Sequence, residues 1–258
     1  MSEVLLAELA WPDYRDRIAA GDIVMLPVGA TEQHGPHLPL GTDALLVSEI
    51  TRQAALRRGR TLVAPTLVYG ARSQPGSGGG QTFPGTISLD ATTLMAVVQD
   101  VLRELVRHGC RKIAVINGHL ENGWFLTEAM DLAVREARLG GVTDLRLMLI
   151  GYGAEVSAET LALMFPEGFP GNALEHAARM ETSMMLHLFP DRVRLDRLPS
   201  DPRGSFPSWQ LFPPELVAVP PSGVLSPAQG CSAEFGRRLV EESIAELVAA
   251  LDGAFPDG

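Results

Sequence analysis

Continuous apolar runs alternate with amphipathic segments along the first 152 residues of the chain. Apolar residues recur at helical spacing over about 43–57, 90–109 and 122–139, and continuous apolar runs cover 23–30, 61–69, 113–116 and 145–152. Runs of this length are typical of strands that are covered on both faces of a parallel sheet. The alternation therefore predicts a mostly parallel α/β sheet flanked by helices.

The pattern is less regular after residue 152. It predicts a short helix near 158–164, a turn at 166–171, a helix from about 174 to 188, and a final helix between Ser232 and Gly253. Eight prolines interrupt residues 199–227, but large apolar side chains lie among them. We expect an ordered, irregular wrap there that offers a contact surface for a partner. Because no repeat or second domain is indicated, we expect residues 1–258 to form a single domain.

The composition narrows the classes of function. Of the 258 residues, 46% are hydrophobic and 20% are charged, as in globular proteins. The formal net charge of −10, without a basic block, argues against nucleic acid as a partner. No apolar run of about 18 residues and no basic leader occurs, so we expect no membrane partner and no export. Two distant cysteines fit a cytoplasmic protein without disulfides.

Metal-ligating side chains follow the first predicted strand. Glu32 and His34 are two residues apart, so in an extended chain they point to the same side, and Asp43 begins the next helix. Ligands of open α/β sheets bind at the carboxyl ends of strands, where these residues lie. Each residue alone is better explained without a metal, for example Asp43 as a helix cap and Glu32 as a solvated carboxylate, but the residues together favour a metal site.

The third apolar run is followed by a second pair of the same kind. His119 and Glu121 are again two residues apart directly after a strand. Two histidines, two glutamates and an aspartate without cysteine form a ligand set suited to Zn²⁺ or Mn²⁺, and the two oxygens of Asp43 can bridge two ions. Two ions that share a water lower its pKa, so we expect a hydrolase.

Other polar residues are weaker candidates for a role in binding or catalysis. Ser77 lies in a glycine-rich stretch that predicts a flexible rim close to a substrate, and a phosphate site there is less favoured. The chain has no GxSxG motif for a serine nucleophile. His176 and Glu175 begin an otherwise apolar helix, which fits an acid/base role and a solvated helix end equally well. His37 could ligate a metal, but because it follows Pro36 close to His34, a supporting role beside the metal or loop packing is equally favoured.

Four stretches resemble the creatininase family of metal-dependent amidohydrolases. They are PVGATEQHGPHLPLGTD, SGGGQTFPGTISLD, NGHLEN and EHAARMETSMML, and the resemblance spans nearly the whole chain. It implies a three-layer α/β/α sandwich, a binuclear site that usually holds Zn²⁺ and Mn²⁺, a cytoplasmic location and a homohexamer arranged as a trimer of dimers.

The resemblance also implies roles for individual residues. Glu32, Asp43 and His119 would hold one ion, and His34, Asp43 and Glu121 the other. His176, with Glu175 beside it, would pass a proton to the leaving nitrogen. Ser77, Leu120, Asn172 and His176 would line the substrate pocket. The implied mechanism is attack by a metal-bridging hydroxide on the carbonyl of a small cyclic amide, creatinine or a creatinine-like lactam.

The sequence departs from the family pattern in the substrate pocket. Family members that hydrolyse creatinine have a tyrosine at the position of Leu120, a tryptophan at Gly153, and a Trp-Asp pair at Asn172-Ala173. Stacking on a flat cationic ring is worth roughly 0.5–2 kcal/mol for each aromatic face. We therefore expect weaker binding of creatinine unless Trp124 or Trp209 takes the place of these rings.

Two alternatives remain. Other branches of the family hydrolyse formamides, a cyclic keto-sugar or a peptide-derived precursor, so the chain can act on such a substrate. A metal-binding protein without catalytic activity is the alternative from a different functional class.

Overall fold

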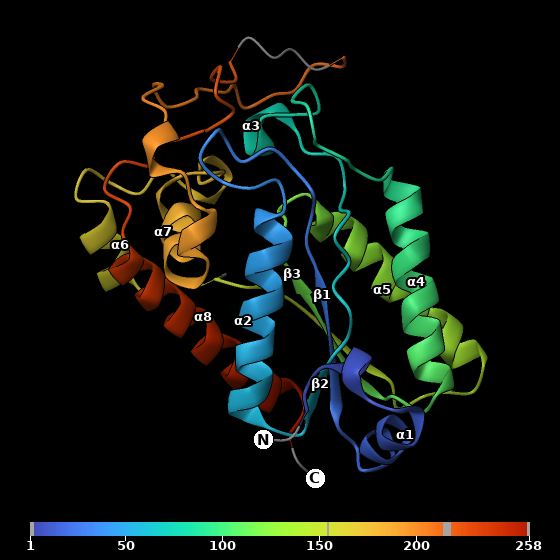
Figure 1. The fold of residues 1–258 in the computed structure, drawn as a ribbon. Helices are drawn as coiled ribbons and strands as arrows, with labels where there is room; N and C mark the ends of the chain where they lie inside the picture. Colours follow the sequence, from blue (N-terminus) through green and yellow to red (C-terminus); the bar gives the residue numbers. More distant parts are fainter. Residues whose placement is uncertain (1–2, 154, 214–217, 257–258) are drawn as a thin grey trace.

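Four parallel strands, in the order β2-β1-β3-β4, lie between two layers of helices (Figure 1). The structure, a computed structural model, describes residues 3–153, 155–213 and 218–256. The strands are β1 (Ile23–Val28), β2 (Thr61–Val63), β3 (Lys112–Asn117) and β4 (Arg146–Gly151). The helices are α1 (Trp11–Ala19), α2 (Thr42–Arg58), α3 (Pro75–Gly78), α4 (Ala91–Arg107), α5 (Asn122–Leu139), α6 (Ala158–Met164), α7 (Arg179–Leu188) and α8 (Ala233–Ala254). The expected three-layer α/β/α fold is confirmed.

The strands bury side chains on both faces because both faces carry helices. Along β1, Ile23 and Met25 join the core on one side of the sheet, and Val24 and Leu26 join the core on the other side. Side chains alternate in this way along any strand, so a doubly covered strand has no polar positions. This explains the continuous apolar runs of the sequence.

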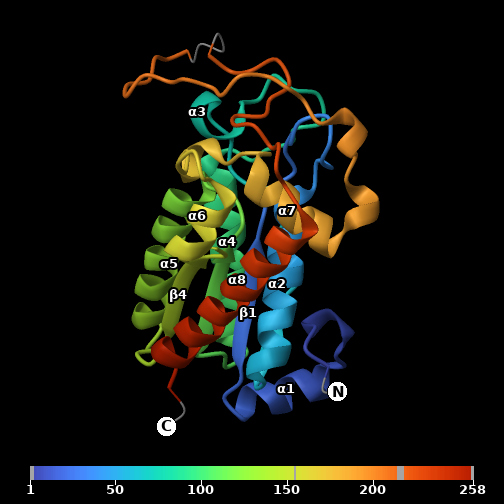
Figure 2. The same ribbon diagram turned by 90° about the vertical axis from the view of Figure 1, so that its left-hand side faces the viewer.

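Each face of the sheet has its own helices. Helices α2, α7 and α8 cover one face, and α4 and α5 cover the other with α1 at its lower edge (Figures 1 and 2). Helix α4 has an apolar stripe of Leu94, Val98, Leu102 and Leu105 that is buried against the sheet. Within the described residues, no helix is both long and apolar enough to cross a bilayer.

Two predicted elements were wrong in their extent. The strand expected over 61–69 ends at Val63, two residues before Pro65, which has no N–H for the sheet. The helix expected from about residue 174 begins only at Arg179, because Ala177 has a positive φ of 54° that breaks the helix. Residues 175–178 are therefore a bend, which matters for the site described below.

The expected wrap is irregular in its described part. Residues 198–213 and 218–232 contain no helix or strand, and they cross the top of the molecule above α3 and α7 (Figures 1 and 2). The backbone N–H of Gly204 donates a hydrogen bond to the Leu225 carbonyl at 2.9 Å, which joins the two ends of the wrap.

Helices α7 and α8 make the closest helix contact, and Gly236 permits it. A Cβ atom at position 236 would lie 1.9 Å from the Ser183 carbonyl oxygen in α7.

We therefore expect Gly236→Ala to lower the free energy of unfolding by about 3 kcal/mol, because neither helix backbone can yield without cost. Gly253→Ala in the same helix is the matched control. Nothing lies within 4 Å of a Cβ there, so we expect a gain of up to about 1 kcal/mol from helix propensity. Urea unfolding measures both changes, and equal effects would contradict the proposed contact.

Candidate metal centre

The carboxyl ends of β1, β3 and β4 lie side by side. Val28 pairs with Asn117, and Asn117 pairs with Gly151, so three strands end at the same level of the sheet. The chain that follows each strand supplies residues to one place: Glu32 and His34 after β1, His119 after β3 and Tyr152 after β4. This is the expected position for a ligand site in an open parallel sheet.

Two glycines allow helix α2 to approach these strand ends. A Cβ at Gly29 would lie 2.6 Å from the Ala44 Cα, and a Cβ at Gly118 would lie 2.7 Å from the Val47 Cβ. Only residues without a side chain permit such contacts between a helix and the ends of two strands. The first turn of α2 is therefore held against β1 and β3, which places Asp43 between the two loops.

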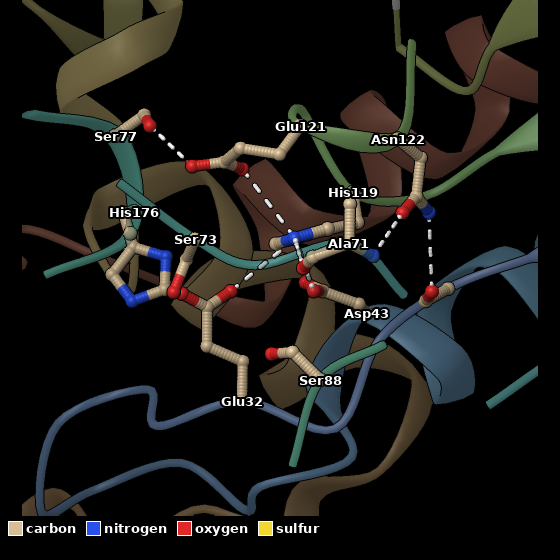
Figure 3. A network of polar contacts seen from close by, with 12 residues as sticks. Glu32, Asp43, Ala71, Ser73, Ser77, Ser88, His119, Glu121, Asn122 and His176 are labelled. Atoms are coloured by element: carbon tan, nitrogen blue, oxygen red, sulfur yellow. Dashed lines mark hydrogen bonds and ion pairs between the residues drawn. The ribbon is translucent and has the colours of Figure 1, made fainter. Parts of the chain in front are cut away.

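Glu32, Asp43 and His119 form the first cluster of ligand atoms. His119 Nδ1 lies 3.1 Å from Asp43 Oδ2 and 3.2 Å from Glu32 Oε2 (Figure 3). One ligand atom from each residue lies within 4.8 Å of the others, and all three side chains are buried. The structure thus brings together the three residues expected to hold the first ion.

His34, Asp43 and Glu181 form the second cluster. His34 Nε2 lies 3.0 Å from Asp43 Oδ1 and 3.7 Å from Glu181 Oε2. The side chain of Glu181 is 18% exposed, whereas those of His34 and Asp43 are almost completely buried. The sequence analysis expected Glu121 in this place, and the structure has Glu181 from the first turn of α7 instead.

Glu121 lies near Nε2 of His119, whereas Glu32 and Asp43 lie near Nδ1. Its Oε1 accepts hydrogen bonds from the backbone N–H of Gln74, at 2.8 Å, and from the hydroxyl of Ser77 (Figure 3). Its Oε2 lies 3.4 Å from His119 Nε2. Glu121 caps the start of α5, so the extended alternation assumed from His119 to Glu121 does not continue, and its carboxylate faces α3.

Negative charge dominates this buried site. Four ligand atoms have no hydrogen-bond partner within the described part of the chain: Glu32 Oε1 and Oε2, His34 Nε2 and Asp43 Oδ2. Burial opposes the charged form of both imidazoles, but the neighbouring carboxylates raise the pKa of His34 and that of His119 well above the ordinary range. Buried carboxylates without hydrogen bonds are costly unless a cation neutralises them, so the donor set fits divalent ions.

His176 and Glu175 lie on the bend before α7. His176 Nε2 donates to the Gln33 carbonyl at 2.8 Å, and the ring centroids of His176 and His34 are 4.5 Å apart. Burial, together with the charge of His34, lowers the pKa of His176 well below its ordinary value. Glu175 Oε2 accepts from the Met180 N–H, Oε1 has no partner among the described residues, and burial raises the pKa of Glu175 to about 8.

A cavity of about 350 Å³ opens beside both clusters. His119 and Glu181 lie in its wall together with Leu120, Asn172 and Glu175. The remaining lining is mainly glycine and apolar side chains, namely Val156, Met180, Met184 and Leu239 with Gly118, Gly151 and Gly153. Ser77 is not part of this wall. Trp124 and Trp209 are 74% and 60% exposed and also lie outside it, so neither replaces the missing aromatic rings.

Four residues near the clusters were missed or left open from the sequence alone. Glu181 was not singled out as a candidate, and the helix that carries it was expected to begin about five residues too early. Tyr152 lines the cavity, and burial together with the charges of Glu181 and Asp43 raises its pKa. His37 contacts Thr182 at 2.9 Å through Nε2, which supports loop packing. Gln33 lies between two ligands, and no sequence signal marked it.

Known proteins have similar sequences along most of the chain. The family model described as Creatininase: Creatinine amidohydrolase matches residues 7–251. A creatinine amidohydrolase of Pseudomonas putida is 44% identical over 98% of both chains. A mycofactocin precursor peptide peptidase of Mycobacterium ulcerans is 34% identical, over 88% of this chain and 84% of the relative.

Solved structures agree with this comparison. A crystal structure of creatinine amidohydrolase (creatininase) superposes with a TM-score of 0.97 at 41% identity, over 100% of both chains. A creatininase structure described as Mn has a TM-score of 0.96 at 42% identity, over 99% of this chain and 100% of the other. A creatininase mutant of Zn-Zn type has a TM-score of 0.96 at 41% identity, over 100% of both chains.

The buried carboxyl group of Glu175 leads to a pH-dependent stability. Its pKa rises from 4.5 to about 8 in the folded protein, so between these values only the folded state holds the proton. The free energy of unfolding then falls as pH rises through this window. We expect Glu175→Gln to remove this loss, which is on the order of a few kcal/mol. Urea unfolding of both proteins between about pH 5 and about pH 8 measures it. Glu159→Gln, at an exposed position of α6, should follow the wild type. Parallel curves for all three proteins would contradict the assignment.

Proposed function

The chain belongs to the creatininase family, and from this premise we propose that it is a hydrolase of a C–N bond in a small cyclic amide that uses two divalent ions. The observation that carries the proposal is the convergence of three carboxylates and two imidazoles at one buried edge of the sheet. Their unpartnered ligand atoms support a cation site. Relatives described in Mn and Zn-Zn forms support Zn²⁺ and Mn²⁺ as these ions.

Asp43 would serve both ions. Its Oδ1 faces His34 and its Oδ2 faces His119, so each oxygen belongs to a different cluster. Glu32 and His119 would complete one position, and His34 and Glu181 the other. The chemistry that two divalent ions supply at such a site is polarisation of a carbonyl group and activation of water.

Glu121 and Ser77 would orient His119. A ligating histidine commonly donates its second ring N–H to a carboxylate or a carbonyl, which fixes the direction of the ring. His119 Nε2 lies 3.1 Å from the Ala71 carbonyl oxygen and 3.4 Å from Glu121 Oε2, and Ser77 holds the other oxygen of Glu121. We therefore assign Glu121 to the support of His119 and Ser77 to the support of Glu121, in place of direct ligation.

His176 would transfer the proton. A neutral imidazole near pH 7 can accept a proton and pass it to the nitrogen that leaves when the amide opens. The lowered pKa of His176 keeps the ring neutral, and its contact with His34 holds it beside the clusters. Glu175, adjacent in sequence, carries its own proton at neutral pH and presents the unpartnered Oε1 beside the cavity.

The cavity indicates the kind of substrate. Its volume of about 350 Å³ suits a small molecule, and Leu120, Val156 and Met184 give it an aliphatic wall. Such a wall favours a compact cyclic amide with an aliphatic side, such as a lactam, and creatinine is retained as the substrate of the 44% identical relative. A formamide, a cyclic keto-sugar or a peptide-derived precursor is the alternative, because the 34% identical relative is a precursor peptide peptidase.

The proposal also covers the domain organisation, the assembly and the location of the enzyme. The resemblance of the whole chain supports a single domain over residues 1–258 that assembles as a homohexamer in the cytoplasm. Light scattering on the purified protein reports the mass of the assembly directly. A monomer at micromolar concentration would contradict this part of the proposal and would leave the proposed chemistry unaffected.

The metal clusters predict which substitutions remove ions. We expect about two ions per wild-type chain, loss of both in Asp43→Asn, and loss of one in Glu181→Gln, since each change deletes a ligand. Glu121→Gln is the matched control, and we expect it to keep two ions with about tenfold weaker binding, because a supporting partner of His119 is altered. Elemental analysis after dialysis measures the content. If Glu121→Gln loses an ion and Glu181→Gln keeps both, Glu121 is the ligand that the sequence analysis expected.

A panel of substrates tests the reaction. We expect Zn²⁺- or Mn²⁺-loaded protein to turn over a cyclic amide from a set of lactams, hydantoins and creatinine, and Asp43→Asn to lower kcat/KM more than about 100-fold. Turnover confined to formamides or short peptides would favour another branch of the family. Protein that binds two ions and hydrolyses none of these compounds would favour the non-catalytic alternative.

A further inference from the structure

The side chain of Gln33 connects three separate segments of the chain. It lies between the two ligands Glu32 and His34 and is 4% exposed. Its Nε2 donates to the Gly78 carbonyl at 3.1 Å, at the end of α3, and to the Gly223 carbonyl at 2.9 Å, in the wrap. Its Oε1 accepts from the Gly35 N–H at 2.9 Å. Both amide hydrogens and the amide oxygen are therefore used.

Two glycines are built around this amide. Gly79 and Gly223 have φ angles of +73° and +80°. A Cβ would lie 2.7 Å from Gln33 Nε2 at the first position and 2.2 Å from Gln33 Oε1 at the second. The positive φ angles disfavour side chains at both positions, and a Cβ at either would displace the Gln33 amide. The amide is thus enclosed by main chain from α3 and from the wrap.

The same residue holds His176. The Gln33 carbonyl oxygen lies 2.8 Å from His176 Nε2 and can only accept a hydrogen bond, so it pairs with the ring when Nε2 carries the proton. The side-chain Nε2 of Gln33 lies 2.9 Å from the same ring atom. The main chain and the side chain of Gln33 therefore both contact this nitrogen and restrict the position of the ring.

The wrap is hydrogen-bonded to both Gln33 and His176. The backbone N–H of Leu225, two residues after Gly223, donates to the His176 carbonyl at 3.2 Å. Segment 223–225 is therefore attached to Gln33 at one residue and to His176 at the other. A displaced Gln33 side chain would release the wrap and the bend that carries His176 together.

We propose that the side chain of Gln33 is a positioning residue that fixes the orientation of the His176 ring and holds segment 223–225 of the wrap against it. The kinetic part of this inference rests on the proposed function, whereas the spectroscopic and exchange parts do not. Gln33 takes no part in proton transfer itself. It acts through His176, since its own polar atoms all face the main chain or that ring.

The test compares two tethers of the wrap. Gln33→Met keeps the length of the side chain and removes its hydrogen bonds, and Gln33→Glu keeps the shape and serves if the first variant folds poorly. Gln229→Ala is the matched control, because Gln229 Nε2 donates to the Pro199 carbonyl at 2.7 Å and so ties the wrap elsewhere. The Zn²⁺-loaded proteins are compared by ¹⁵N NMR of the histidine rings, by hydrogen exchange at Leu225, by metal content, and by kcat and KM.

We expect the Gln33 variants to keep two ions, to change the ¹⁵N signals of the His176 ring because its position is less restricted, and to exchange the Leu225 amide at least tenfold faster. We expect kcat to fall about 10- to 100-fold with KM changed less than about threefold. Gln229→Ala should leave the ring signal and kcat within about twofold of the wild type. An unchanged His176 signal in both Gln33 variants, or an equal change in Gln229→Ala, would overturn the proposal even if no substrate has been identified.

Discussion

Uncompensated negative charge at the carboxyl edge of the sheet is the constraint on which the rest of this structure depends. Glu32, Asp43 and Glu181 bring three carboxylates next to two buried imidazoles, and several of their atoms have no hydrogen bond among the described residues. Such groups are kept together only by a rigid framework, because each alone would move to water. The framework consists of three strand ends at one level and a helix start pressed against two of them.

The sequence predicted the parts of this framework that local periodicity determines. Helices α5 and α6 have the expected bounds, because their apolar positions recur at 3.6 residues and their ends carry turn residues. The positions of Glu32, Asp43 and His119 were also predictable from strand ends. Glu181 was not, because its approach depends on the bend at Ala177, whose positive φ no pattern of apolar residues reveals. For Glu121, the N-cap position at the start of α5 replaces the extended chain that was assumed after His119, so its carboxylate lies beside Ser77 and His119 Nε2.

The residues proposed to hold the ions and the residues proposed to recognise the substrate lie in different parts of the fold. The clustered ligands belong to the sheet edge and the helices packed on it, whereas Leu120, Gly153 and Asn172 belong to loops around the cavity. Loops tolerate replacement because few packed contacts depend on them. Leu120, Gly153 and Asn172 line the cavity, and none of them belongs to the clusters of ligand atoms. Similarity of the whole fold defines the reaction class more tightly than it defines the substrate.

The order of the ligands along the chain has a consequence for synthesis on the ribosome. Glu32, Asp43 and His119 all lie within the first 119 residues, and the strands that support them, β1 and β3, end at Val28 and Asn117. Glu181 arrives more than sixty residues later, on a helix that packs against α8 at the far end of the chain. Synthesis therefore supplies Glu32, Asp43 and His119 before Glu181, and helix α8, against which α7 packs, follows later still.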